Sequence, residues 1–150
     1  MMDRTAVGKQ GAEFDLDVER GKIHEFARAI RATDEAYFKK VPVAPPTFLT
    51  SMFHWEELVE GANPWHLVKM SQERGMHAEQ EYVFHGPPPR AGTRLTCQSR
   101  IAEMYDKQGK RGGTLTFVVM VTEFRDPSGR LVAEARMTAV ETAQAPVEKA

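Results

Sequence analysis

An apolar pattern with helical spacing lies in residues 46–59, which read PTFLTSMFHWEELV. Its large apolar side chains recur at intervals of three and four residues: Phe48, Met52, Trp55 and Val59. That spacing places them on one face of an α-helix, and Leu49 and Phe53 widen the face. Thr47 has the side chain of an N-cap, so we expect a largely buried helix that begins there. An aromatic and methionine face of this kind is typical of core packing, or alternatively of the wall of an acyl pocket.

Ahead of this helix, the sequence predicts a second helix and an extended linker. Apolar residues follow a helical period between Val18 and Arg31, at Ile23, Phe26, Ala27 and Ile30. The segment 41–46 contains three prolines, which remove backbone donors and favour extended geometry. The two helices are therefore separate elements.

Beyond His77 the apolar period changes to two, as in β-strands. Alternation extends over four segments: residues 77–85, 94–101, 115–122 and 131–139. Asp126-Pro127-Ser128-Gly129 has the composition of a tight hairpin turn. Helices followed by strands indicate an α+β fold, an antiparallel sheet with a helix against one face. We expect one domain over residues 14–142, with flexible tails at 1–13 and 143–150.

Composition narrows the class of protein without selecting a function. The 150 residues carry 20 Lys and Arg against 21 Asp and Glu, so the net charge gives no reason to expect nucleic acid or an anionic membrane as partner. Cys97 is the only cysteine, which excludes an internal disulfide and a CxxC metal or redox motif. No apolar run is long enough to cross a bilayer, and we expect a cytoplasmic protein.

Familiar catalytic motifs are missing from the sequence. It contains no GxSxG, no Walker loop, no HExxH and no dinucleotide-binding glycine fingerprint.

The order of several short segments resembles the N-terminal-type domain of the MaoC-like dehydratases. The segments that carry the resemblance are residues 26–30, 43–48, 77–82, 85–93, 116–119 and 125–133. Together they extend over roughly Phe14 to Thr142, and the likeness is closest to the smaller, non-motif subunit of heterodimeric (3R)-hydroxyacyl-ACP dehydratases. The resemblance implies a hotdog fold, in which a curved antiparallel sheet wraps around a long central helix. It also implies an acyl-CoA or acyl-ACP thioester as ligand and a second hotdog fold beside the first. The implied reaction, addition of water to a conjugated thioester, needs neither a metal nor a redox cofactor, so we expect none.

One departure from the family pattern bears on the chemistry. Catalytic members carry an Asp-x-Asn-Pro-x-His run after the first helix, where the Asp and His handle water and a proton. By spacing, Ala32 stands here at the Asp position, Asp34 at the Asn position and Tyr37 at the His position. An alanine transfers no proton, and a tyrosine is a poor substitute for an imidazole near neutral pH. Asp34, Tyr37 and His85, which matches a recurrent family histidine, are the remaining candidates for a chemical role.

Other residues are candidates for contact with the substrate. We expect Phe48, Met52, Phe53 and Trp55 to line an acyl pocket, and Thr47 either to cap the helix or to help polarise the thioester carbonyl. Four cations are expected to form one cluster for coenzyme A phosphates or an acidic carrier protein: Arg90, Lys107, Lys110 and Arg111.

These observations lead to one leading hypothesis of function and two alternatives. The first is a subunit of an (R)-specific enoyl-thioester hydratase or 3-hydroxyacyl-thioester dehydratase, a hydro-lyase whose motif-bearing partner supplies the Asp and His. The second is a hotdog acyl-CoA thioesterase in which Glu56 or Glu57 activates water. The third is a non-catalytic homo-oligomer that binds acyl-CoA. An adjacent reading frame that encodes the Asp-x-Asn-Pro-x-His run would favour the first.

Overall fold

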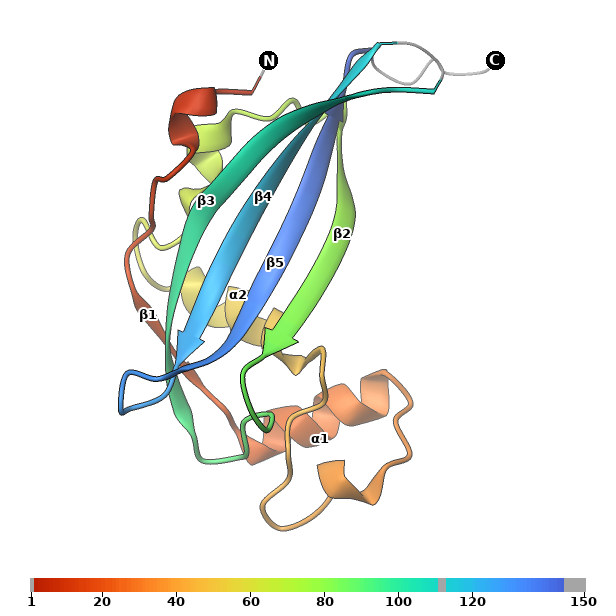
Figure 1. The fold of residues 1–150 in the computed structure, drawn as a ribbon. Helices are drawn as coiled ribbons and strands as arrows, with labels where there is room; N and C mark the ends of the chain where they lie inside the picture. Colours follow the sequence, from red (N-terminus) through yellow and green to blue (C-terminus); the bar gives the residue numbers. More distant parts are fainter. Residues whose placement is uncertain (1, 111–112, 145–150) are drawn as a thin grey trace.

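The computed structural model describes residues 2–110 and 113–144, and its main feature is one curved antiparallel sheet. The five strands are β1 (Phe14–Asp17), β2 (Gly75–Phe84), β3 (Arg94–Gln108), β4 (Thr114–Arg125) and β5 (Leu131–Thr142). Their order across the sheet is β1-β3-β4-β5-β2. The three longest strands are therefore central, and β1 and β2 form the edges (Figure 1).

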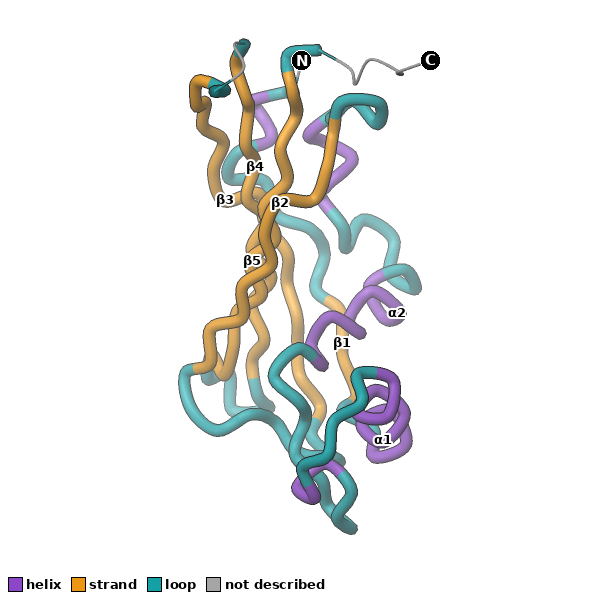
Figure 2. The backbone as a smooth tube through the Cα atoms, turned by 90° about the vertical axis from the view of Figure 1, so that its right-hand side faces the viewer, coloured by secondary structure: helices purple, strands orange, loops and turns teal. Residues whose placement is uncertain are grey.

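The helical elements lie on one side of this sheet (Figure 2). They are α1 (Arg20–Ala29), α2 (Phe53–Glu56) and four 3-10 segments: η1 (Arg4–Ala6), η2 (Glu35–Tyr37), η3 (Phe48–Met52) and η4 (Pro64–Val68). The α+β class and the antiparallel sheet with helix on one face are confirmed.

The central helix is shorter than the sequence predicts. Residues 48–52 form a 3-10 segment, and only Phe53–Glu56 continue as α-helix. Thr47 precedes this segment, but its side chain makes no capping hydrogen bond. The 3-10 winding changes which side chains share a face, because residues three apart are eclipsed in it. The expectation of a long central helix is therefore corrected to a short segment of two types.

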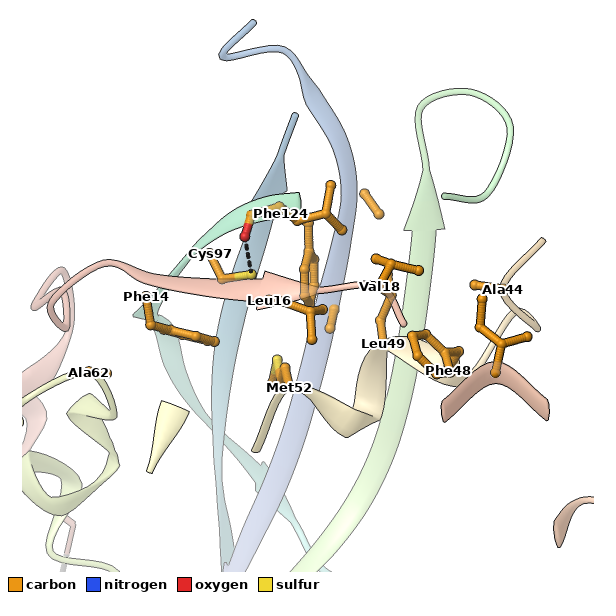
Figure 3. Packing of buried hydrophobic residues seen from close by; sticks show 14 residues of the cluster. Phe14, Leu16, Val18, Ala44, Phe48, Leu49, Met52, Ala62, Cys97 and Phe124 are labelled. Atoms are coloured by element: carbon orange, nitrogen blue, oxygen red, sulfur yellow. Dashed lines mark hydrogen bonds between the residues drawn. The ribbon is translucent and has the colours of Figure 1, made fainter. Parts of the chain in front are cut away.

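Apolar side chains form two separate cores on the helical side of the sheet. The larger core joins β1, α1 and the segment 48–56 to β3, β4 and β5, with Leu16, Ile23, Leu49 and Phe124 fully buried (Figure 3). The smaller core lies towards the other end of the sheet, around Ile101, Val118 and Met120. Leu95, Cys97, Ser99 and Ile101 alternate along β3 and are all buried, as the period of two predicts. Leu95 and Cys97 join the larger core, and Ile101 joins the smaller one.

The N-terminal residues differ from the expected flexible tail. Met2 and Ala6 are buried in the smaller core, and residues 8–11 follow β3 through backbone hydrogen bonds. Gly8 N donates to Ile101 O at 2.8 Å, and Gly11 N donates to Ser99 O at 2.8 Å. Residues 2–13 are therefore part of the domain, and the short strand β1 that follows them was not predicted. The expected C-terminal tail lies outside the described residues beyond 144.

The hairpin between β4 and β5 has the predicted turn. Gly129 N donates to Asp126 O at 2.8 Å, and Gly129 has a φ of +82°, in the region that favours glycine. The Asp126 carboxylate accepts hydrogen bonds from Ser128 and Arg130, which lower its pKa to about 2. This network fixes the register in which β4 and β5 pair.

Candidate functional site

The segment after α1 holds the positions where the family pattern places its acid and base. Ala32 N donates to Ala27 O at 2.8 Å, and this bond fixes the turn out of the helix. The Asp34 carboxylate caps η2 by accepting from Ala36 N at 2.8 Å, while Tyr37 packs against the larger core. Asp34 and Tyr37 thus have structural roles here, and Ala32 has no polar side chain.

A narrow cleft lies between the central helical segment and the sheet. Its walls come from the segment 50–53 and from strands β2, β4 and β5, and it is lined by Thr50, Met52, Phe53, Gln80, Tyr82, Met120, Thr122, Ala135 and Met137. Its volume of about 10 Å³ holds roughly one water molecule. Burial raises the pKa of the Tyr82 phenol, which is also hydrogen-bonded to Thr50. Because β2 is an edge strand, the cleft lies beside a free edge of the sheet.

A second, larger hollow lies near α1, on another side of the same helical segment. It has a volume of about 230 Å³ and is lined by Phe48, Trp55, Leu58, Ser51 and His54, with three charged side chains from residues 17–22. The four expected pocket residues are therefore divided: Met52 and Phe53 line the narrow cleft, and Phe48 and Trp55 line the hollow. Phe48 and Met52 are also core residues, each at most 4% exposed.

Glu56 is a buried carboxyl group at the end of the central segment, only 2% exposed. One oxygen accepts from Ser99 Oγ and the other from Asn63 Nδ2, both at 3.0 Å, while Ser99 Oγ lies 2.8 Å from Thr122 Oγ1. Loss of hydration raises the pKa of Glu56, although these hydrogen bonds favour the ionised form. Both oxygens are occupied, so Glu56 is not free to activate a water molecule. Glu57 is exposed.

His85 lies just after β2 and is paired with an acid. Its Nε2 is 3.0 Å from Glu134 Oε2, and its backbone N donates to Val132 O at 2.9 Å. Glu134 is itself largely buried and also faces Arg136. The histidine thus joins the end of β2 to β5 in this arrangement.

The expected cluster of four cations is not formed. Arg90 lies near the linker, with its Nη1 3.5 Å from Val41 O, whereas Lys107 lies at the far end of β3 over the rings of Tyr105 and Phe117. Lys110 follows in the loop between β3 and β4, and Arg111 lies outside the described residues. Because β3 runs from Arg94 to Gln108, Arg90, just before its start, and Lys107, near its end, lie at opposite ends of the sheet.

Sequence reasoning did not identify most residues of the cleft. Thr50, Gln80, Tyr82, Thr122 and Met137 come from four separate elements, and nothing in their local sequence marks them as pocket residues. The alternation of Gln80 and Tyr82 indicates that they share a face of β2, which was the only available signal. Cys97 is buried as predicted, and burial raises the pKa of its thiol.

In residues 2–110 and 113–144, no three His, Cys, Asp or Glu side chains gather in a way that would hold a metal ion. None of the helices in the described part of the chain has the length and apolarity to cross a membrane.

Comparison with solved structures identifies the class of fold. A chain of the C-terminally truncated HadBC (3R-hydroxyacyl-ACP dehydratase) complex from Mycobacterium tuberculosis is 25% identical, with a TM-score of 0.67, and the match covers 87% of this chain and 95% of that one. A chain of the ChsH1-ChsH2 complex from the same organism is 16% identical, with a TM-score of 0.67 over 96% of this chain and 89% of that one. A MaoC-like dehydratase from Phytophthora capsici is 20% identical, with a TM-score of 0.69 over 95% of this chain but 50% of that one. The fold is the hotdog fold of MaoC-like dehydratases, as the resemblance implied.

The family model described as "FAS1-like, dehydratase domain region" matches residues 5–135. The chain therefore belongs to this dehydratase family. A search of curated proteins gives no match.

Proposed function

We propose that this chain is the non-catalytic subunit of an (R)-specific enoyl-thioester hydratase or 3-hydroxyacyl-thioester dehydratase. In the hydration direction, the hydroxyl of water adds to C3 of a 2-enoyl thioester and a proton adds to C2. This reaction needs a general acid/base at C3 and hydrogen-bond donors at the thioester carbonyl. A motif-bearing partner subunit supplies the acid/base pair, and this chain forms part of the acyl-binding wall.

The observation that carries the proposal is the side-chain content of residues 32–37. The family's Asp position is occupied by an alanine, Asp34 is engaged as the cap of η2, and Tyr37 packs against the core. A subunit that depends on another chain for catalysis is expected to belong to the dehydratase family and yet to lack the acid/base pair itself.

The free edge of the sheet supports a pairing of two hotdog folds. The outer side of β2 has no neighbouring strand among the described residues, and Met76 on it is 52% exposed. An exposed strand edge of ten residues is a ready template for pairing with another chain. HadBC is named as a complex, and the Phytophthora chain is about twice as long as this one. Both are in keeping with two folds working together.

The test is hydration of crotonyl-CoA by purified chains. We expect little activity from this chain alone and at least a hundredfold more when it is co-expressed with a subunit that carries Asp-x-Asn-Pro-x-His. As a control, the partner alone is assayed at the same concentration. Equal activity of the partner with and without this chain would contradict the proposal, as would strong activity of this chain alone.

The alternatives predict different results from the same preparation. A thioesterase would release free thiol from acyl-CoA, and a Glu57→Gln variant would lose that activity; Glu56 is a weaker candidate because both of its oxygens are engaged. A non-catalytic homo-oligomer would bind acyl-CoA tightly with no turnover, with or without a motif-bearing partner.

A further inference from the structure

Unpaired cations and exposed apolar side chains gather at one end of the fold. Residues 20–41, which comprise α1 and the segment after it, hold six Lys and Arg against three Asp and Glu, in a chain whose net charge is −1. Three of the large apolar side chains left exposed lie in the same stretch: Ile30 at 49%, Phe38 at 39% and Val41 at 51%. We define the docking surface as these three residues together with Arg28, Arg31, Lys39, Lys40 and Arg90.

Contacts in this part of the fold connect α1 with the segment 38–41, and that segment with Arg90. The Phe38 ring lies 5.9 Å from the ring of His24, and Arg28 is one helical turn beyond His24 on the same face of α1. Lys39 and Lys40 follow Phe38 directly. Arg90 joins them from the other side, because its Nη1 lies 3.5 Å from Val41 O.

Ile30 is exposed for a definite reason. It extends the buried stripe of Ile23 and Ala27 by one more turn, but α1 ends at Ala29, beyond the edge of the core. The stripe therefore presents an apolar residue that none of the described residues covers.

Within residues 2–110 and 113–144, the cations of this surface have no acidic partner, unlike several arginines of the sheet. Among the described residues, Arg28, Arg31, Lys39 and Lys40 form no ion pair, and Arg90 contacts only a carbonyl oxygen. On the strands, by contrast, Arg94, Arg125 and Arg136 are each within 4 Å of a carboxylate. Cations without ion-pair partners that surround exposed apolar side chains are typical of a protein interface with an apolar centre and a charged rim.

We propose that the docking surface binds an acidic protein partner, the carrier protein that delivers the acyl thioester. This inference rests on the proposed function, since it names the form in which the substrate arrives. A carrier protein with a carboxylate-rich helix and an apolar residue on it would meet both the cations and the side chains of Ile30, Phe38 and Val41. The phosphates of coenzyme A would engage the cations but leave three apolar side chains uncovered.

The test measures binding of a crotonyl-loaded, acidic acyl carrier protein to this chain by calorimetry. Reversal of two charges in Lys39→Glu/Lys40→Glu is expected to weaken binding at least tenfold, and Phe38→Ser at least threefold. The matched control is Lys107→Glu/Lys110→Glu at the other end of the sheet, which is expected to change affinity less than twofold. Affinity for the unchanged chain is also expected to fall as salt rises from 50 to 300 mM.

Three results would overturn the inference: no binding at millimolar carrier protein, equal losses in the 39/40 and 107/110 variants, or displacement of the carrier protein by free coenzyme A at similar concentration. A fourth is loss of the motif-bearing subunit from the 39/40 variant, which would make this surface a subunit interface. Failure of the proposed function is seen separately, because that function is tested by crotonyl-CoA hydration with the unchanged chain and its motif-bearing partner, an assay that contains no carrier protein.

Discussion

Glu56 and Glu57 are adjacent acids that differ in burial. In the sequence it is one of two adjacent acids after an apolar helix face, and either is a candidate for activating water. In the structure the two differ completely: Glu57 is exposed, whereas Glu56 joins Asn63 and Ser99 beneath the sheet. Ser99 in turn contacts Thr122, which lines the narrow cleft. The buried carboxyl therefore orients a polar group at the wall of the cleft.

The raised pKa of Glu56 predicts a specific pH dependence of stability. A carboxyl whose pKa is raised by folding contributes fully below its unfolded pKa of about 4.5, and that contribution is lost as the pH rises through the folded pKa. Glu56→Gln keeps a neutral group with a donor for Ser99 and an acceptor for Asn63. We expect Glu56→Gln to become more stable relative to the original chain as the pH rises above 4.5. The difference between their free energies of unfolding should grow by at most about 1.4 kcal/mol per pH unit. Urea denaturation at pH 4, 6 and 8 measures this.

Glu57→Gln is the matched control for that measurement, because it removes the same charge from an exposed position. We expect its stability to run parallel to that of the original chain. Parallel curves for Glu56→Gln as well would mean that Glu56 is not desolvated in solution.

At the scale of elements, the N-terminal segment acts as an additional layer on the smaller core. Met2 and Ala6 are buried there, and residues 8–11 hydrogen-bond to β3. Removal of residues 2–9 is expected to lower the free energy of unfolding by roughly 3 kcal/mol, from the lost burial of a methionine and several hydrogen bonds. Thermal unfolding measures the change.

A point substitution tests the same contact without shortening the chain. Ala6→Asp places a charge in the core and should destabilise strongly, whereas Val7→Asp, at a position 42% exposed, should have little effect. If neither Ala6→Asp nor the truncation lowers the melting temperature, the N-terminal segment is a flexible tail and the prediction is wrong.

The β2 edge gives a prediction about assembly. Met76→Glu places a charge on the exposed outer strand, which should weaken pairing with a partner subunit at least tenfold. Folding of the isolated chain should be unaffected, because Met76 is half exposed. Sedimentation of the mixed subunits measures the affinity, and Val7→Glu serves as the control for adding a charge at an exposed apolar position. Equal affinity for both variants would place the subunit interface elsewhere.

For the whole molecule, periodicity predicted the sheet well and the central segment less well. Alternation in β3 is clear because one face is buried from Leu95 to Ile101, and the strand then continues to Gln108. The apolar alternation predicted β5 as well, although residues 138–141 of that strand are all buried. In β4, Val118 to Val121 are all buried, so apolarity alone does not show which face meets the helices. The 3-10 winding of Phe48–Met52 and the pairing of β1 with β3 depend on tertiary contacts, which no local pattern contains.

For the candidate site, the sequence indicated which catalytic residues are missing but not which residues line the cleft. The resemblance to MaoC-like dehydratases, aligned by spacing, assigned Ala32 and Tyr37 to the positions of the family's Asp and His. The cleft residues are far apart in sequence, from Thr50 to Met137, and only folding brings them together. The same holds for the docking surface, where Arg90 comes close to Val41 through the pairing of Val43 with Arg90.

The molecule as a whole has the hotdog fold of its family, and we propose that it lacks only the acid/base pair. If that pair is all that is missing, Ala32→Asp/Tyr37→His should give a folded chain with measurable crotonyl-CoA hydration, because the turn at Ala32 is held by a backbone hydrogen bond that the new side chain leaves intact. We expect activity at least tenfold above that of Ala32→Asn/Tyr37→His, which matches it in shape but has no carboxylate to take the proton. Both variants should lose some stability, since Tyr37 packs against the core. Equal, background rates from two folded variants would show that the vestigial segment is not aligned with a thioester site, and that the partner must contribute more than an acid and a base.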